Sequence, residues 1–277
     1  MNKAILAVSF GTSYPDTLEK TIAATEKALA AAYPDWPAFR AFTSGMIIRK
    51  LQSRDGVHID NVTQAMERLK DAGVTQVAVQ STHVMHGEEY EKMLAQLSPY
   101  RAVMDIAVGA PLLHAQRDYE AVADALLSWL PVPGADEALL LMGHGTEHFA
   151  NAAYAQMEHV LRARCDRIYL ATVEGYPTLD LVLEQLSKRP EIRRLTLAPF
   201  MLVAGDHARN DMAGGEDSWK VQLEHQGYEV SCILKGLGEC PAIQNLFVAH
   251  CGDAMASLPR GGKLYGVGVG PGDPELM

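Results

Sequence analysis

Short apolar segments alternate with longer amphipathic segments along most of the chain. Segments such as KAILAVSFGTS (3–13) and EALLLMGHGTEH (137–148) stay apolar until they end in glycine and polar residues, as buried parallel strands do. The predicted strands lie within residues 3–13, 38–45, 76–84, 104–113, 137–148, 167–177, 195–207 and 228–239, and the predicted helices within residues 14–34, 60–73, 87–100, 118–130, 149–164 and 178–190. This alternation predicts an α/β fold in which helices cover both faces of parallel sheets.

The order of strands and helices starts again after residues 131–137, a segment rich in proline and glycine. Three short matches relate the two parts: SFGTS (9–13) with GHGTE (143–147), AFTSG (41–45) with ATVEG (171–175), and STHVMHGEE (81–89) with PFMLVAGDH (199–207). We therefore predict two similar halves, residues 1–130 and 137–258, with a cleft where the carboxyl ends of their strands face each other.

The same alignment singles out three pairs of positions just after predicted strands. Phe10, Ser44 and Glu89 of the first half fall opposite His144, Glu174 and His207 of the second half. Two imidazoles and one carboxylate suit divalent Zn, Co, Ni or Fe, and three protein ligands leave positions open for a substrate. For His144 alone a capping or packing role is an equal alternative, and the other two residues favour a functional site.

Other candidate residues have simpler interpretations. Glu89 lies in GEEYEK, where an acid in the first helical turn commonly complements the helix dipole. His83 and His86 are three residues apart, but His83 falls inside a predicted strand, which would send the two rings to opposite faces. We therefore favour separate roles for these two histidines over a metal-binding pair.

Composition excludes several classes of function. The 277 residues are 48% hydrophobic, which is enough for one large or two ordinary domains. The 24 basic and 34 acidic residues give a net charge of -10, which argues against broad binding to nucleic acid or acidic membranes. No apolar segment approaches the roughly 20 residues of a membrane span, and the N-terminus is unlike a signal peptide. Four cysteines without CxxC spacing fit a cytoplasmic protein.

Two further segments carry weaker signals. MIIRKLQSR (46–54) supplies Arg49, Lys50 and Arg54, which form either a solvated helix face or a contact for an anionic ligand. YGVGVGPGDPEL (265–276) is rich in glycine, but no helix or βαβ unit follows it. No GxxxxGK[ST] motif occurs, so the sequence gives no support for ATP-driven chemistry.

These motifs occur together in a known family. From about residue 3 to 255 the chain resembles the class II tetrapyrrole chelatases, most closely the anaerobic cobalt chelatases of cobalamin synthesis. The segments that carry the resemblance are LAVSFGTSYPDT, FRAFTSGMIIRKL, HGEEYEK, LMGHGTEH, VEGYP, FMLVAGDHARNDM, DSWK and GLGECPAI.

The resemblance implies two flavodoxin-like halves around a cleft and the insertion of Co(II) into sirohydrochlorin without ATP. It implies that His144, Glu174 and His207 bind the metal, that His144 and His207 are catalytic, and that Glu89 supports them as an acid. No cofactor is expected beyond the substrate metal.

The C-terminal segment 262–277 resembles the opening strand and loop of the S-adenosylmethionine-dependent tetrapyrrole methyltransferases. About 15 residues cannot form that domain, so the segment is either a linker or the truncated start of a fused methyltransferase. A methyltransferase acting on the next corrinoid intermediate, fused or as a partner, would favour cobalt over the other metals.

A hypothesis for the mechanism follows from the resemblance. His144 and His207 would hold Co(II) as neutral imidazoles with Glu174 as the oxygen ligand, and the same groups or Glu89 would accept the pyrrole protons. Sirohydrochlorin carries eight carboxylates, so a protein with a net charge of -10 must offer it local cations. The expected substrate-binding residues are the cations Arg49, Lys50, Arg54 and Arg209, together with Phe10 and Ser44 at the matching positions of the first half.

Two alternatives remain open at this stage. The same site could insert Ni(II) or Fe(II), because a nitrogen and oxygen ligand set selects weakly among these ions, and Zn(II) could also bind. A different class of function is a carrier that binds metal or tetrapyrrole without turnover. The sequence leaves the oligomeric state open, a homo-oligomer included.

Overall fold

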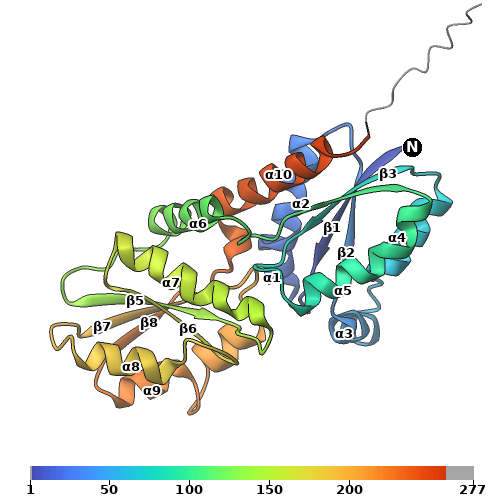
Figure 1. The fold of residues 1–277 in the computed structure, drawn as a ribbon. Coiled ribbons are helices and arrows are strands. Elements are labelled where there is room, and N and C mark those ends of the chain that lie inside the picture. Colours follow the sequence, from blue (N-terminus) through green and yellow to red (C-terminus); the bar gives the residue numbers. More distant parts are fainter. Residues whose placement is uncertain (1, 260–277) are drawn as a thin grey trace, which may run out of the picture.

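Two parallel four-stranded sheets form the centre of the protein, whose computed structural model describes residues 2–259 (Figure 1). The strand order is β2-β1-β3-β4 in the first sheet and β6-β5-β7-β8 in the second. Each strand of one sheet therefore has a counterpart at the same place in the other. This arrangement confirms the predicted α/β class with two similar doubly wound halves.

The bounds of the elements follow the predicted alternation. The first half contains β1 (Lys3–Ser9), α1 (Pro15–Lys20), α2 (Ile22–Ala32), β2 (Ala38–Phe42), α3 (Gly45–Asp55), α4 (Val62–Asp71), β3 (Gln76–Ser81), α5 (Glu88–Leu97), η1 (Ser98–Ala102), β4 (Asp105–Gly109) and α6 (Gln116–Trp129). The second contains β5 (Glu137–Gly143), η2 (Phe149–Asn151), α7 (Ala152–Arg164), β6 (Ile168–Thr172), α8 (Leu179–Ser187), β7 (Arg194–Pro199), η3 (Ala208–Met212), α9 (Trp219–His225), β8 (Glu229–Cys232), η4 (Leu237–Glu239) and α10 (Pro241–Ala256).

The central strands are buried on both faces because helices cover each side of the sheet. In β1, Ala4, Leu6 and Val8 belong to one hydrophobic cluster, whereas Ile5 and Ala7 between them belong to another. Since side chains alternate across a strand, a strand covered on both faces must be apolar at every position. This is the physical reason for the continuous apolar segments in the sequence.

Some predicted elements end earlier or break. The helix predicted over residues 14–34 is interrupted at Thr21, whose backbone lies close to Gly238 of the second half. The strands predicted over 76–84 and 195–207 end at Ser81 and Pro199. The placement of His83 inside a strand was therefore wrong, because the chain leaves the sheet two residues before it.

The last helix of each predicted half packs on the other sheet. Helix α6 follows β4 but contacts α7, and its Val122 shares a cluster with Leu139 of β5. Helix α10 ends the second half, yet it contacts α2, β3 and β4, and its Cys251 packs with Ile5 of β1. Figure 1 shows α10 (red) along the first half and α6 (green) beside α7. Each sheet is thus completed by a helix from the other part of the sequence.

The two exchanged helices meet at a buried pair of polar side chains. Asp118 of α6 lies 3.2 Å from Nε2 of His250 in α10, and both side chains are 5% exposed. The same carboxylate accepts the N–H of Ala115 at 2.7 Å. Burial alone would raise the pKa of Asp118, but these hydrogen bonds outweigh it and lower the pKa.

Within residues 2–259, no helix has both the length and the hydrophobicity that a membrane span requires.

Replacing Asp118 with alanine should lower the free energy of unfolding by about 2–4 kcal/mol, because the buried ring of His250 and the N–H groups of His114 and Ala115 lose their partner. Denaturant unfolding followed by circular dichroism measures the change. Asp253→Ala is the matched control at the same helix crossing, since Asp253 is 70% exposed and pairs with Arg117 at 3.3 Å. This exposed pair should contribute less than about 1 kcal/mol. Equal losses in the two variants would contradict the role given to the buried pair.

Candidate metal centre

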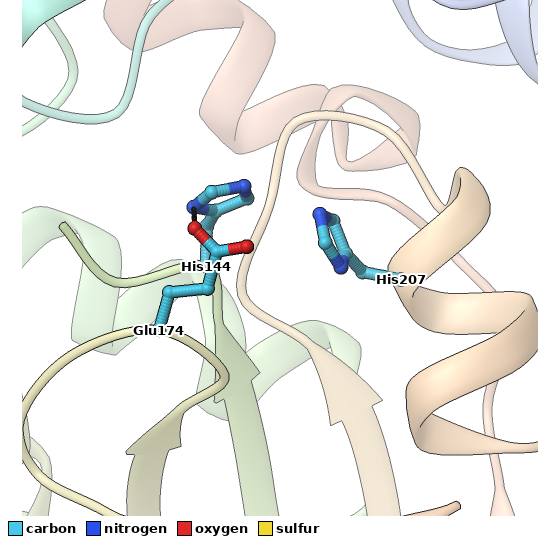
Figure 2. A group of neighbouring side chains, drawn as sticks. All are labelled: His144, Glu174 and His207. Carbon is cyan, nitrogen blue, oxygen red and sulfur yellow. Dashed lines mark ion pairs between the residues drawn. The ribbon is translucent and has the colours of Figure 1, made fainter.

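Three potential metal ligands lie together at the carboxyl ends of neighbouring strands. His144 follows β5 directly, Glu174 lies two residues after β6, and His207 precedes the single π-helical turn η3, which comes after β7. One ligand atom of each residue lies within 4.8 Å of the others. Figure 2 shows the three side chains directed toward one another above the strand ends.

The group is open to solvent. The His144 and His207 rings stand nearly perpendicular, with centroids 4.6 Å apart, and Nδ1 of His144 lies 3.8 Å from a Glu174 oxygen. The side chains of His144, Glu174 and His207 are 46%, 59% and 33% exposed. A divalent ion can reach these ligands from solution and still have positions free for a second molecule.

Glycines hold the first two ligands next to each other. Gly145 has a φ of 86°, and a Cβ atom on it would lie 2.5 Å from the backbone nitrogen of Gly175. The loops after β5 and β6 therefore touch through their backbones, and the N–H of Glu174 donates to the carbonyl of His144 at 2.8 Å. This close approach explains why glycine flanks His144.

The hydrogen bonds of both rings leave the same nitrogen free. Nδ1 of His144 is 2.8 Å from the carbonyl oxygen of Gly145, so it must donate. Nδ1 of His207 is 2.5 Å from a carboxylate oxygen of Asp211, one helical turn further on. In both neutral rings the lone pair is then on Nε2, and a carboxylate behind a ligating histidine is a common support in metal sites.

Two supporting residues escaped the sequence analysis. Asp211 follows His207 by four residues, a spacing that could have indicated a contact on one helical turn. Asn151 accepts the N–H of Thr146 at 3.1 Å and donates to the carbonyl of Tyr176 at 2.7 Å, which ties the His144 loop to the Glu174 loop. No pattern in the sequence pointed to Asn151, because its partners are distant backbone groups.

The chain is similar to known proteins over almost its whole described length. A sequence profile described as Cobalt chelatase (CbiK) matches residues 3–256. The chain belongs to the cobalt chelatase (CbiK) family. This confirms the resemblance to the tetrapyrrole chelatases that the motifs indicated.

Individual relatives of the cobalt chelatase cover almost the whole chain. A sirohydrochlorin cobaltochelatase of Salmonella typhimurium is 45% identical over 92% of this chain and 97% of its own length. The sirohydrochlorin cobaltochelatase CbiKC of Nitratidesulfovibrio vulgaris is 33% identical over 92% of each chain. The structure of SirB from Bacillus subtilis with Fe3+ has a TM-score of 0.61 at 16% identity, covering 92% of this chain and 96% of SirB. This last likeness concerns the fold.

In this cobalt chelatase the counterparts of the three ligands in the first half have other partners. Phe10 is 44% exposed at the end of β1, and Ser44 caps α3 by accepting the N–H of Ile47 at 3.4 Å. Glu89 lies in the first turn of α5, 3.3 Å from the ammonium of Lys92. Within residues 2–259, only His144, Glu174 and His207 form a potential metal-binding group.

Within the described part of the chain, two of the four predicted substrate-binding cations already have carboxylate partners, and two do not. Arg54 is bound to Asp55, and Arg209 donates to Asp16 at 2.9 Å. Among the ion pairs of residues 2–259, neither Arg49 nor Lys50 has a carboxylate partner, and the Lys50 ammonium lies 5.9 Å from the Tyr14 ring centroid. Arg49 and Lys50 are therefore the cations most available to an anionic ligand.

His86 and His148 meet one carboxylate at the contact between the two halves. An oxygen of Glu91 lies 3.9 Å from Nε2 of His86 and 3.4 Å from Nε2 of His148. Nδ1 of His148, however, accepts the N–H of Ala150 at 3.2 Å, so the neutral ring carries its proton on Nε2. That tautomer donates toward Glu91 and cannot bind a metal through the same nitrogen.

A cavity of about 390 Å³ lies elsewhere, beside the edge strand β2. Its lining includes Glu26, Arg40 and Asp60 but none of the residues predicted for the site. The chemistry of the ligand group, rather than the size of a cavity, therefore identifies the candidate site.

His83 lies in the loop after β3 and has partners different from those of His86. Its Nδ1 is 2.7 Å from the hydroxyl of Ser81, and its Nε2 is 3.4 Å from the hydroxyl of Thr43. Burial lowers the pKa of His83 to about 4, although the carboxylate of Glu89 opposes this shift. The ring is neutral at physiological pH.

His83 should make the cobalt chelatase less stable in mild acid. Its pKa is about 4 in the folded chain and has an ordinary value near 6.5 in the unfolded chain, so only the unfolded chain binds this proton between those values. The free energy of unfolding should fall by up to about 1.4 kcal/mol per pH unit as the pH drops from 6.5 toward 4. His83→Gln should lose less over this range in urea unfolding. Parallel pH profiles for the two proteins would contradict the lowered pKa of His83.

Proposed function

We propose that this cobalt chelatase inserts Co(II) into sirohydrochlorin at His144, Glu174 and His207, without ATP. The observation that carries the proposal is the convergence of these three ligand atoms within 4.8 Å at one end of the second sheet. Two curated relatives that span nearly the whole chain are named sirohydrochlorin cobaltochelatase. The ligand group and the activity for which these relatives are named together support metal insertion into a tetrapyrrole.

The metal is a substrate, so the site must bind it and then release it. Two imidazole nitrogens and one carboxylate hold a divalent ion with positions left for water and for the nitrogens of the macrocycle. Exposure of the three side chains keeps the site accessible to a flat and bulky second substrate. A closed shell of four protein ligands would retain the ion instead.

Insertion exchanges one Co(II) for two pyrrole protons, and no electron is transferred. As the ion moves to the macrocycle, Nε2 of His144 and Nε2 of His207 regain their lone pairs and become proton acceptors. Asp211 supports this role at His207, because its carboxylate stabilises the imidazolium that forms. Glu89 of the first half is the alternative acceptor, with Lys92 as its present partner.

Recognition of the macrocycle requires both apolar surface and positive charge. Phe10 and Tyr176 are large exposed aromatic residues at strand ends, 44% and 57% exposed, and such rings stack on flat conjugated ligands. Arg49 and Lys50 supply charge for the carboxylates of the substrate. Ser44 is a weaker candidate for direct contact because its hydroxyl already caps α3.

Replacing His144 or His207 with alanine should lower the rate of Co(II) insertion by about 100-fold or more, because the ion loses a ligand and the proton an acceptor. The absorbance change of sirohydrochlorin measures the rate, and circular dichroism checks the fold. His159→Ala is the control, since His159 is exposed on α7 and outside the group. A fully active double variant would refute the site.

The same assay separates the alternative functions. Continued turnover with Ni(II) or Fe(II) but not Co(II) would assign a different metal. A spectral change that stops at one equivalent of sirohydrochlorin per protein would indicate a carrier.

Arg49→Glu and Lys50→Glu should each raise KM for sirohydrochlorin by about 10-fold at low ionic strength, with little change in kcat. The effect should shrink in about 0.5 M salt, where charges are screened within a few ångströms. Lys188→Glu makes the same change of charge at the end of α8, at the amino ends of the strands, and should leave KM unchanged. An unchanged KM in all three variants would indicate that Arg49 and Lys50 belong to a solvated helix face and do not bind the substrate.

A further inference from the structure

His207 is carried by a segment that leaves the second sheet and packs against the first half. After β7 ends at Pro199, residues 200–205 form neither helix nor strand. Leu202 and Val203 of this segment pack against a hydrophobic cluster formed by α2, β2 and α3. The backbone that leads to His207 is therefore positioned partly by the first half, while Met201 and Ala204 of the same segment pack in a cluster of the second half.

Polar contacts to the first half occur on both sides of His207. Asp206, the preceding residue, accepts a hydrogen bond from the hydroxyl of Tyr14 at 2.5 Å. Arg209, two residues after His207, donates to Asp16 at 2.9 Å, and its guanidinium lies 4.4 Å from the centroid of the Tyr14 ring. Tyr14 thus contacts residues on both sides of the ligand, Asp206 before it and Arg209 two positions after it.

The other two ligands are held mainly by contacts within the second half. His144 and Glu174 are joined by a backbone hydrogen bond, and Asn151 ties their loops together within the second half. The His144 loop contacts the first half at His148, four residues from the ligand, where an oxygen of Glu91 lies 3.4 Å away. Of the three ligands, His207 is the one with contacts to the first half within two residues on both sides.

We propose that Tyr14, Asp206 and Arg209 form a clasp between the two halves that positions His207, so that the metal site is complete only while the clasp is closed. The inference rests on the proposed function of His207 as a metal ligand. Tyr14 is a positioning residue in this scheme, because it acts on the metal through the segment that carries His207.

The clasp has the properties of a contact that opens. Asp16 is 56% exposed, and exposed ion pairs contribute little to stability. A substrate rich in carboxylates offers Arg209 the same chemical group that Asp16 offers, so it competes for the guanidinium. Opening the clasp would free His207 and leave the ion with two protein ligands, which favours its transfer to the macrocycle.

The test is Co(II) binding to the full chain without tetrapyrrole, read as Kd and as the visible spectrum of the bound ion. Tyr14→Phe keeps the ring beneath Arg209 and removes only the hydroxyl. It should weaken Co(II) binding by about 10-fold and shift the spectrum, as loss of a residue that orients a metal ligand does. Asp206→Ala should act in the same direction, whereas Asp206→Asn keeps an acceptor oxygen and should restore most of the affinity.

Tyr33→Phe is the matched control for the loss of a hydroxyl between the halves. Tyr33 donates to the carbonyl of Val248 in α10 at 2.8 Å, and it lies between α2 and β2, at the amino end of the strand. It should lower Tm to a similar extent as Tyr14→Phe without changing Kd or the spectrum. Equal loss of Co(II) affinity in both variants would show a general effect of loosened halves and would overturn the clasp.

His207→Ala distinguishes failure of the clasp from failure of the proposed site. If His207→Ala weakens Co(II) binding and Tyr14→Phe leaves both Kd and spectrum unchanged, the clasp is refuted and the site remains. If His207→Ala leaves Co(II) binding unchanged, the assignment of the metal site is refuted, and the clasp with it.

Discussion

A parallel sheet brings the residue that follows each strand to the same edge, and the candidate site depends on this constraint. Three neighbouring strands of the second sheet deliver His144, Glu174 and His207 to one place, although they are up to 63 residues apart in sequence. The first two ligands are held by the close contact of two glycine-containing loops and by the hydrogen bonds of Asn151 to both loops. The third ligand, His207, needs a longer segment that packs against the other half. The site therefore depends both on the second sheet and on a contact between the two halves.

The two halves share a strand order but have diverged at their strand ends. Phe10 and His144 follow equivalent strands, and Gly11 and Gly145 after them both have positive φ angles. The loop conformation is therefore a property of the fold, whereas the imidazole is not. The first half uses the matching position of Glu174 for a serine that caps a helix. The two halves thus share a fold, but only the second half carries the proposed metal ligands.

Much of this could be predicted from sequence because it depends on local patterns. Continuous apolar segments and helical periodicity identified the strands and most helices, and the short internal matches placed His144 and Glu174 at equivalent strand ends. The exchange of α6 and α10 could not be predicted, since the apolar face of an amphipathic helix can pack on either sheet. The pairing of Arg209 with Asp16 joins residues 193 apart, and no local rule anticipates such a contact. The predicted methyltransferase start at 262–277 lies outside the described residues.

The exchanged helices mean that the two halves are not separable modules. A fragment ending at residue 130 would carry α6 with its apolar side uncovered, and its own sheet would lack the cover that α10 provides. A fragment beginning at residue 137 would carry α10 with its apolar side uncovered, and its sheet would lack the cover that α6 provides. In a protein with a single half, a second copy could fill these places by exchanging the last helix, and the present chain has the architecture of such a dimer within one polypeptide.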